Sequence, residues 1–295
     1  MSQSPYLVDA QWLAQHIEEP NVVVIDVRFS LSEPELGSSQ YELGHLPGAY
    51  YLDLNQDLSS PVLAHGGRHP LPDWSKFVEK LRSIGINSSP HSRVVIYDDS
   101  RFAFAARLWW MLRYLGHEEV SILDGGIQAW KQAGLPLSQD MSKDSPPQQA
   151  GNFAPDMQKD WTVDIRTVRQ RKEGLGVAVI DARSPERFRG EVEPIDPVAG
   201  SIPGAINAFW KEVSTEDGYL KSAEALADYW SSLNPMDQII VYCGSGVTAC
   251  VNLFSMAVAG HPMYTLYPGG WSDWCSYLPE EGLEVDEREE ESAFW

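Results

Sequence analysis

Cysteine is scarce in this chain of 295 residues. The sequence contains three cysteines, Cys243, Cys250 and Cys275, and no two of them form a Cys-x-x-Cys pair. A disulfide framework or a structural zinc site needs more cysteines at closer spacing, so the sequence argues against both. A chain with few cysteines and no expected disulfide is typical of a reducing compartment. We therefore predict a cytoplasmic protein.

Positive charge is also in short supply. Lys and Arg number 22 against 42 Asp and Glu, for a formal net charge of −20. Such a balance argues against nucleic acid and anionic membranes as partners. The chain has no apolar run of membrane length, and residues 1–13 lack the basic and apolar regions of a signal peptide. An anionic ligand would therefore depend on positive charge local to its site.

What the sequence does have is a long repeat. Val-Ile-Asp-x-Arg occurs at 24–28 and 179–183, and Gly-x-x-Pro-Gly-Ala at 44–49 and 200–205. Gly-Gly-x-x-x-Trp ends both series, at 125–130 and 269–274. The offsets, 155, 156 and 144 residues, are far longer than a solenoid period and indicate a duplicated domain. With 43% hydrophobic residues, two domains can each form a core.

Each copy alternates apolar strand patterns with helical patterns, which predicts an α/β fold with parallel sheets. In the first copy we expect helices over 9–17, 73–84 and 103–115, and strands over 22–25, 93–97 and 120–123. The predicted organisation is a first domain over 1–137, a linker rich in Ser, Pro, Gln and Asp over 138–158, a second domain over 159–285 and an acidic tail over 286–295.

The chemistry is expected in the loop Cys-Gly-Ser-Gly-Val-Thr-Ala at 243–249. The loop follows an apolar strand pattern at 239–242, and a helical pattern begins at 247. Gly244 and Gly246 allow a tight turn whose N–H groups, together with the helix dipole, favour an anion. They favour the thiolate of Cys243, which makes it a candidate nucleophile. The alternative, a small buried hydrophobic cysteine, is what we predict for Cys250 and Cys275.

This loop and the repeated motifs closely resemble the rhodanese-type sulfurtransferases, in particular the thiosulfate/3-mercaptopyruvate branch, over residues 7 to about 280. The resemblance implies two tandem rhodanese-like domains, a site in the cleft between them, and no metal or organic cofactor. It implies that Cys243 takes a sulfane sulfur from a small anionic donor, thiosulfate or 3-mercaptopyruvate, as a persulfide. A thiophilic acceptor, cyanide or a thiol, then receives the sulfur.

The first domain lacks the nucleophile. Aligning the strand patterns at 94–97 and 239–242 places Asp98 at the position of Cys243, and Asp cannot carry sulfane sulfur. We therefore predict an inactive first domain. A phosphatase with Cys, five residues and Arg is excluded by Ala249 at the place of that Arg. The remaining alternative is a non-catalytic rhodanese-like binding or sulfur-carrier module, and the intact loop argues against it.

The resemblance also assigns the donor-binding residues. It implies that Arg187 binds the anionic group of the donor and that Gly244, Gly246, Val247 and Thr248 line the substrate loop. Close mercaptopyruvate enzymes carry a second arginine about nine residues further on, where this chain has Glu-Pro-Ile-Asp-Pro at 193–197. That departure argues against mercaptopyruvate as donor, whereas the uncharged loop argues for it. The preference stays open here.

A Ser-His-Asp proton relay is the last feature that the resemblance implies. Ser245 is its hydroxyl or a helix-capping residue, two equal alternatives. His69, in Gly-Arg-His-Pro-Leu-Pro at 67–72, is its imidazole or an exposed loop histidine. The matching acid position is Asn55, with Asp53 and Asp57 close by, so the acid is unsettled.

Overall fold

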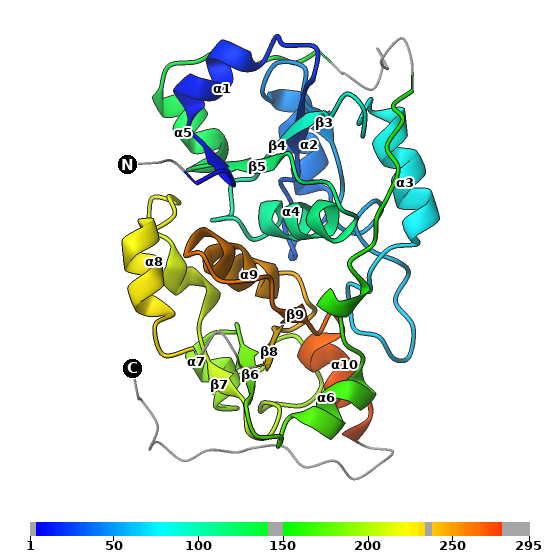
Figure 1. The fold of residues 1–295 in the computed structure, drawn as a ribbon, viewed down its shortest axis with the longest axis vertical. Coiled ribbons are helices and arrows are strands. Elements are labelled where there is room, and N and C mark those ends of the chain that lie inside the picture. The colour runs from blue at the N-terminus through cyan, green and yellow to red at the C-terminus, as the bar shows by residue number, and fades with distance from the viewer. Residues whose placement is uncertain (1–3, 141–149, 234–237, 279–295) are drawn as a thin grey trace. The chain divides into compact units, whose positions relative to one another are not determined.

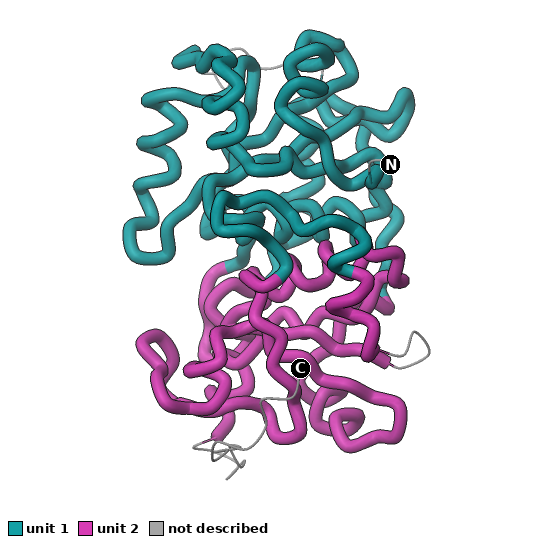
Figure 2. Tube along the Cα trace, turned by 90° about the vertical axis from the view of Figure 1, so that its left-hand side faces the viewer, with its two compact units in different colours: residues 1–60, 71–159, 213–226 teal, residues 61–70, 160–212, 227–295 magenta. Residues whose placement is uncertain are grey.

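A computed structural model describes residues 4–140, 150–233 and 238–278. The predicted acidic tail lies outside the described residues, as do residues 141–149 of the predicted linker. The chain forms two compact units (Figure 2). Unit 1 comprises Met1–Ser60, Leu71–Lys159 and Val213–Leu226, and unit 2 comprises Pro61–Pro70, Asp160–Glu212 and Ala227–Trp295. The domains predicted from sequence are continuous segments, whereas each unit includes a short segment from the other half of the chain.

Unit 1 is built on a parallel sheet of five strands (Figure 1). Their order is β1 (Leu7–Val8), β5 (Val120–Leu123), β4 (Arg93–Tyr97), β2 (Val22–Asp26) and β3 (Tyr50–Tyr51). Side chains from α1 and α5 pack together with those of β2 and β4 in one core cluster, and α4 lies on the other side of the sheet. The helices of this unit are α1 (Ala10–His16), α2 (Leu36–Leu43), α3 (Trp74–Ser83), α4 (Ala105–Tyr114) and α5 (Gly126–Gln132).

Unit 2 repeats the plan with four parallel strands. Their order is β7 (Ile206–Asn207), β6 (Val177–Asp181), β8 (Gln238–Tyr242) and β9 (Thr265–Leu266). A core cluster joins α6 and α10 to one face of β6 and β8. The helices of the second half are α6 (Ile165–Arg171), α7 (Pro185–Phe188), α8 (Ala223–Tyr229), α9 (Ala249–Val258) and α10 (Gly270–Ser276), with 3-10 turns η2 (Lys159–Trp161) and η3 (Trp210–Val213). The predicted α/β class with two parallel sheets is confirmed.

The central strands explain the choice of fold. β4 and β8 are apolar almost throughout, and their last four side chains are all buried. Strands buried on both faces suit a parallel sheet covered by helices on either side. Loops at the carboxyl ends of such strands gather at one edge, where α/β proteins place their ligands. Cys243 and Asp98 each lie at that edge of their own sheet, directly after an inner strand.

The repeated Asp-x-Arg motif forms the same buried ion pair in both units. Arg183 Nη2 lies 2.7 Å from Asp181 Oδ2 and donates to the Gly200 carbonyl at 2.6 Å. In unit 1, Arg28 Nη2 lies 2.6 Å from Asp26 Oδ2. Burial opposes the charge on Arg183, but the carboxylates around it prevail and raise its pKa. The motif therefore supports the turn that follows each strand, and the role of Arg183 is structural.

Helix boundaries follow local signals. Asp9 caps α1, its carboxylate accepting from Trp12 N at 2.7 Å, and Asp73 caps α3 in the same way. α9 begins at Ala249, two residues after the predicted start at 247, because Gly246 has a φ of +73° and holds the loop out of helical geometry. In the part of the chain that is described, no helix has both the length and the apolar character needed to span a bilayer.

Candidate active site

Cys243 follows β8 immediately and is almost fully buried, at 2% exposure. The loop after it depends on glycine. A Cβ on Gly246 would lie 2.3 Å from the Pro268 carbonyl oxygen, and the residue is left-handed as well. No other residue type can hold this turn without moving the neighbouring chain. The glycine spacing that the sequence shows is therefore required by the loop itself.

A second glycine turn fixes the backbone of the cysteine loop. Two N–H groups in the first turn of α10 donate to carbonyl groups of the cysteine loop. Trp271 N donates to the Cys243 carbonyl at 2.8 Å, and Ser272 N donates to the Gly244 carbonyl at 2.9 Å. A Cβ on Gly270 would lie 2.5 Å from the Cys243 carbonyl oxygen. The close approach explains why glycine is the first residue of this helix, and it leaves the orientation of the loop little freedom.

Two guanidinium groups flank the residue after the cysteine. A Cβ built on Gly244 would lie 3.0 Å from Arg68 Nη2, and 3.5 and 3.6 Å from the two terminal nitrogens of Arg187. Burial lowers the pKa of Arg68, the neighbouring Arg187 lowers it further, and Cys243 acts in the opposite direction. The structure thus places local positive charge beside the loop in a chain of net charge −20. Arg187 was predicted from the sequence, and Arg68 was not.

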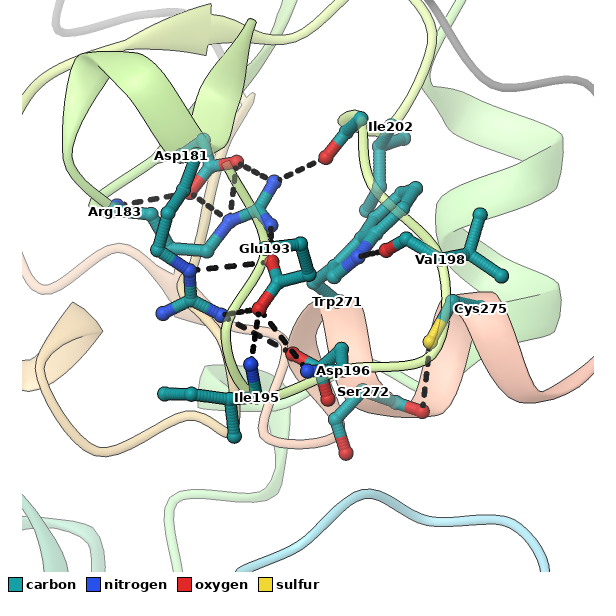
Figure 3. A network of polar contacts seen from close by, with 12 residues as sticks. Asp181, Arg183, Glu193, Ile195, Asp196, Val198, Ile202, Trp271, Ser272 and Cys275 are labelled. Atoms are coloured by element: carbon teal, nitrogen blue, oxygen red, sulfur yellow. Dashed lines mark hydrogen bonds and ion pairs between the residues drawn. The ribbon is translucent and has the colours of Figure 1, made fainter. Parts of the chain in front are cut away.

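Both arginines are held by buried carboxylates. Arg187 contacts Glu193 at 2.7 and 3.1 Å and Asp196 at 3.2 Å, while Arg68 pairs with the other oxygen of Asp196. Glu193 also accepts from Arg183 at 3.1 Å, and Figure 3 shows it at the centre of this network. The Glu193 and Asp196 side chains are 3% and 2% exposed, against 27% and 17% for Arg68 and Arg187. The carboxylates are thus the buried members of the network and the two arginines the accessible ones.

Ser245 and His69 form a close pair. Ser245 Oγ and His69 Nδ1 lie 2.7 Å apart, and both side chains are buried. The burial contradicts an exposed loop histidine. Thr248 occupies the N-cap position of α9, three residues further on, so Ser245 is not the helix cap. A neutral imidazole nitrogen can accept the serine proton and an imidazolium can donate one, so the pair is able to pass a proton.

The acids near the predicted relay position have partners within unit 1. Asp53 Oδ1 accepts from the backbone N–H groups of Asn55 and Gln56 at 2.7 and 2.9 Å. Asp57 accepts from Asp53 N at 2.8 Å and pairs with Lys80 at 2.9 Å. Within their unit, both carboxylates thus stabilise one turn.

Asp98 closes the corresponding loop of unit 1. Its Oδ1 accepts from Ser100 N and Phe102 N at 3.0 and 3.2 Å, and its Oδ2 from Phe104 N and Ala105 N at 3.0 Å each. Burial raises the pKa of Asp98, and these backbone donors oppose the increase. A carboxylate thus occupies a cradle of backbone N–H groups at the position that aligns with the cysteine.

The two loops share one left-handed backbone position. Arg101, with a φ of +56°, aligns with Gly246, whose φ is +73°. Unit 1 has a second left-handed residue, Phe102 at +71°, where unit 2 has Val247. A cavity of about 130 Å³ adjoins the unit 1 loop, and Asp98 is part of its lining. In unit 1, backbone N–H groups of this loop are thus paired with a carboxylate of the chain itself.

The other two cysteines lie on helices. Cys250 is on α9, fully buried, with its Sγ 3.4 Å from the Gly246 carbonyl oxygen. Cys275 is on α10, and burial raises the pKa of its thiol. A raised pKa keeps a thiol protonated and unreactive. In the described part of the chain, no cluster of three or more His, Cys, Asp or Glu side chains is arranged to hold a metal.

We expect Asp98→Ala to leave sulfur-transfer turnover within a few-fold of the unchanged protein, because the hydrogen bonds described for its carboxylate all serve the unit 1 loop. Stability should fall by roughly 1–3 kcal/mol or more, since buried backbone donors lose their acceptor. Steady-state kinetics with thermal unfolding on the same sample checks both. A loss of about a hundredfold in a folded variant, the scale of losing a general acid or base, would contradict an inactive first domain.

Comparison with known proteins agrees with this architecture. The model of the rhodanese-like domain matches twice, over residues 9–133 and 164–277. A probable 3-mercaptopyruvate sulfurtransferase of Pseudomonas aeruginosa is 45% identical over 276 residues, 92% of this chain and 95% of that protein. A Mycobacterium tuberculosis protein provisionally named as the thiosulfate sulfurtransferase SseB is 40% identical over 274 residues, covering 92% and 94% of the two chains.

Solved structures give the same result. The crystal structure of SseA from Escherichia coli, described as a 3-mercaptopyruvate sulfotransferase, matches with a TM-score of 0.77 and 33% identity, over 90% of this chain and 99% of that one. The chain therefore belongs to the rhodanese-like family. More particularly, it is a sulfurtransferase with two tandem rhodanese-like domains.

Proposed function

We propose that Cys243 carries the transferred sulfur as a persulfide. The thiolate attacks the sulfur of the donor, an S–S bond forms, and the bond between that sulfur and the rest of the donor breaks. With 3-mercaptopyruvate the electron pair goes to carbon, which takes the thiol proton and leaves as pyruvate. With thiosulfate, sulfite leaves with the pair. Cyanide or a thiolate acceptor then takes the outer sulfur and restores the Cys243 thiolate.

The juxtaposition of Cys243 with two arginines carries this proposal. Small sulfur donors are anions, and Arg187 lies close enough to the loop to bind the anionic group with its planar fork. The backbone N–H groups of Gly244, Gly246, Val247 and Thr248 are proposed to hold the charged persulfide. Support comes from unit 1, where the N–H group of Phe102, the residue that aligns with Val247, is one of four backbone N–H groups that bind the Asp98 carboxylate.

Ser245 and His69 are proposed to move the proton. The thiol of 3-mercaptopyruvate must lose a proton as its sulfur is attacked, and the departing carbon must gain one. The hydroxyl of Ser245 and the imidazole of His69, 2.7 Å apart, can take up that proton and return it within one turnover. Thiosulfate has no proton to move, so the relay matters for the mercaptan donor alone.

Among the two donors we propose 3-mercaptopyruvate. The loop residues Gly244 and Ser245 are uncharged, and the 45% identical relative from P. aeruginosa bears the name of a probable mercaptopyruvate enzyme. The missing arginine at 193–197 argued against this donor, but Arg68 places a second guanidinium beside Gly244. That guanidinium removes the objection that the sequence raised.

The test compares kcat/KM for 3-mercaptopyruvate and thiosulfate on one preparation, with cyanide as acceptor and at fixed ionic strength because screening alters charge effects. We expect 3-mercaptopyruvate to be preferred by at least about tenfold, the equivalent of one charge-assisted contact. Equal or better use of thiosulfate would reject the donor assignment. A small thiol as acceptor in place of cyanide should give the same donor order, because the persulfide is common to both half-reactions.

We propose that the first domain is catalytically inactive and that the chain acts in the cytoplasm on small-molecule donors and acceptors. The net charge of −20 supports the exclusion of nucleic acid as a partner.

A further inference from the structure

We propose that Arg68 is a second donor-binding cation of this enzyme and that Asp196 is the positioning residue that orients it. The inference deepens the proposed function and rests on it for the identity of the donor. The family's second arginine would fall at about position 196, where this chain has the opposite charge. The cation is instead on the loop that also carries His69.

Distance supports a role at the reacting group. Arg68 Nη2 is the atom nearest to a Cβ built on Gly244, nearer than either terminal nitrogen of Arg187. Gly244 follows Cys243 directly, so an anion bound next to the sulfur is within reach of both guanidiniums. Two neighbouring guanidinium groups can bind the carboxylate and the adjacent carbonyl of an α-keto acid at the same time. A single guanidinium cannot make bidentate hydrogen bonds to both groups.

The burial of Asp196 and the partial exposure of Arg68 fit a positioning role for the first and a binding role for the second. The Asp196 side chain is 2% exposed and shares its two oxygens between Arg68 and Arg187, while the Arg68 side chain is 27% exposed. A purely structural pair would need no exposed member so near the cysteine. The Gly67 backbone also fixes the loop, because a Cβ there would lie 2.4 Å from the Gly269 carbonyl oxygen. Arg68 is therefore presented on a rigid segment, as a binding residue should be.

The experiment measures the site's preference for anions without sulfur transfer. Alkylation rates of Cys243 by iodoacetate, an anion, and iodoacetamide, its neutral analogue, are followed by peptide mass spectrometry. We expect Arg68→Met to lower the iodoacetate/iodoacetamide rate ratio about tenfold or more, and Arg68→Lys to retain most of it because the charge remains. The control is Arg189→Met, which removes an arginine paired with Glu191 at the surface and should leave the ratio unchanged.

Kinetics on 3-mercaptopyruvate separates binding from structure. Arg68→Met should raise KM at least about tenfold with kcat changed only a few-fold, the pattern of lost uniform binding. If Arg68 merely neutralised Asp196, the double variant Arg68→Met/Asp196→Asn would regain the original KM. We expect its KM to stay at least about tenfold high.

The outcomes distinguish the two proposals. If both alkylating agents slow equally in Arg68→Met, or if the double variant recovers, the role of Arg68 is structural and this inference is overturned. If neither donor is turned over by the unchanged protein, the proposed function fails. The alkylation ratio still decides whether Arg68 supplies the anion preference of the cysteine loop, because it requires no sulfur donor.

Discussion

Cys243→Ser is expected to abolish sulfur transfer with every donor. Serine keeps the size and the hydrogen-bonding capacity of the residue, but its oxygen cannot form the S–S bond that holds the transferred sulfur. The loop should survive the change, because its shape depends on Gly246, on Gly270 and on the backbone bonds to α10. Activity with 3-mercaptopyruvate and with thiosulfate, measured with cyanide as acceptor, is the direct check.

Cys250→Ser and Cys275→Ser are the matched controls. Both thiols are buried on helices and outside the loop, so we expect each variant to retain most of the activity. Some stability is lost, since a hydroxyl is buried in place of a less polar thiol. Unfolding curves on the same samples separate that cost from catalysis. If Cys243→Ser retained activity, or if a folded Cys250→Ser variant lost it, Cys243 would not be the nucleophile.

Arg187→Ala should lower kcat/KM about ten- to a hundredfold for either donor. The substitution removes a charge-assisted contact worth roughly 1.5–3 kcal/mol. It also leaves Glu193 and Asp196, both almost fully buried, with less compensation, which adds repulsion toward an anionic donor. The effect should weaken as salt is raised, because part of the interaction is screened.

Arg189→Ala is the natural control, two residues along and paired at the surface with Glu191 at 2.6 Å. Its kcat/KM should stay within about twofold, as expected for an exposed ion pair. If Arg187→Ala behaved like Arg189→Ala, the anion would have to be bound by Arg68 and the loop N–H groups alone, and the role given to Arg187 would be withdrawn.

Local sequence patterns predicted the parts of the fold that depend on neighbouring residues. The strand pattern at 93–97 is β4 as the structure has it, and the helices expected over 9–17 and 73–84 are α1 and α3, which Asp9 and Asp73 cap. The duplicated Asp-x-Arg motif forms the same ion pair in each unit. These features are set by side-chain periodicity and by contacts two or three residues apart, which a single sequence displays.

Features set by distant contacts were missed. Nothing within residues 67–72 indicates that Arg68 approaches Gly244, because these two residues are 176 positions apart in the sequence. One signal was available in the sequence. A chain that lacks an arginine at 193–197 and still binds an anionic substrate must supply positive charge from another segment. Arg68 is such a residue, because it is adjacent to the candidate site residue His69. The short strands β1, β3 and β7, each of two residues, were also too brief for any pattern.

The most direct test is mass spectrometry of the protein after treatment with donor and removal of the excess. The account predicts one added sulfur atom, located on the peptide that contains Cys243 and lost again on addition of cyanide. Thiosulfate-treated and 3-mercaptopyruvate-treated samples should carry it on the same residue. A sulfur on Cys250 or Cys275, or no added sulfur in a protein that turns over donor, would contradict the persulfide at Cys243.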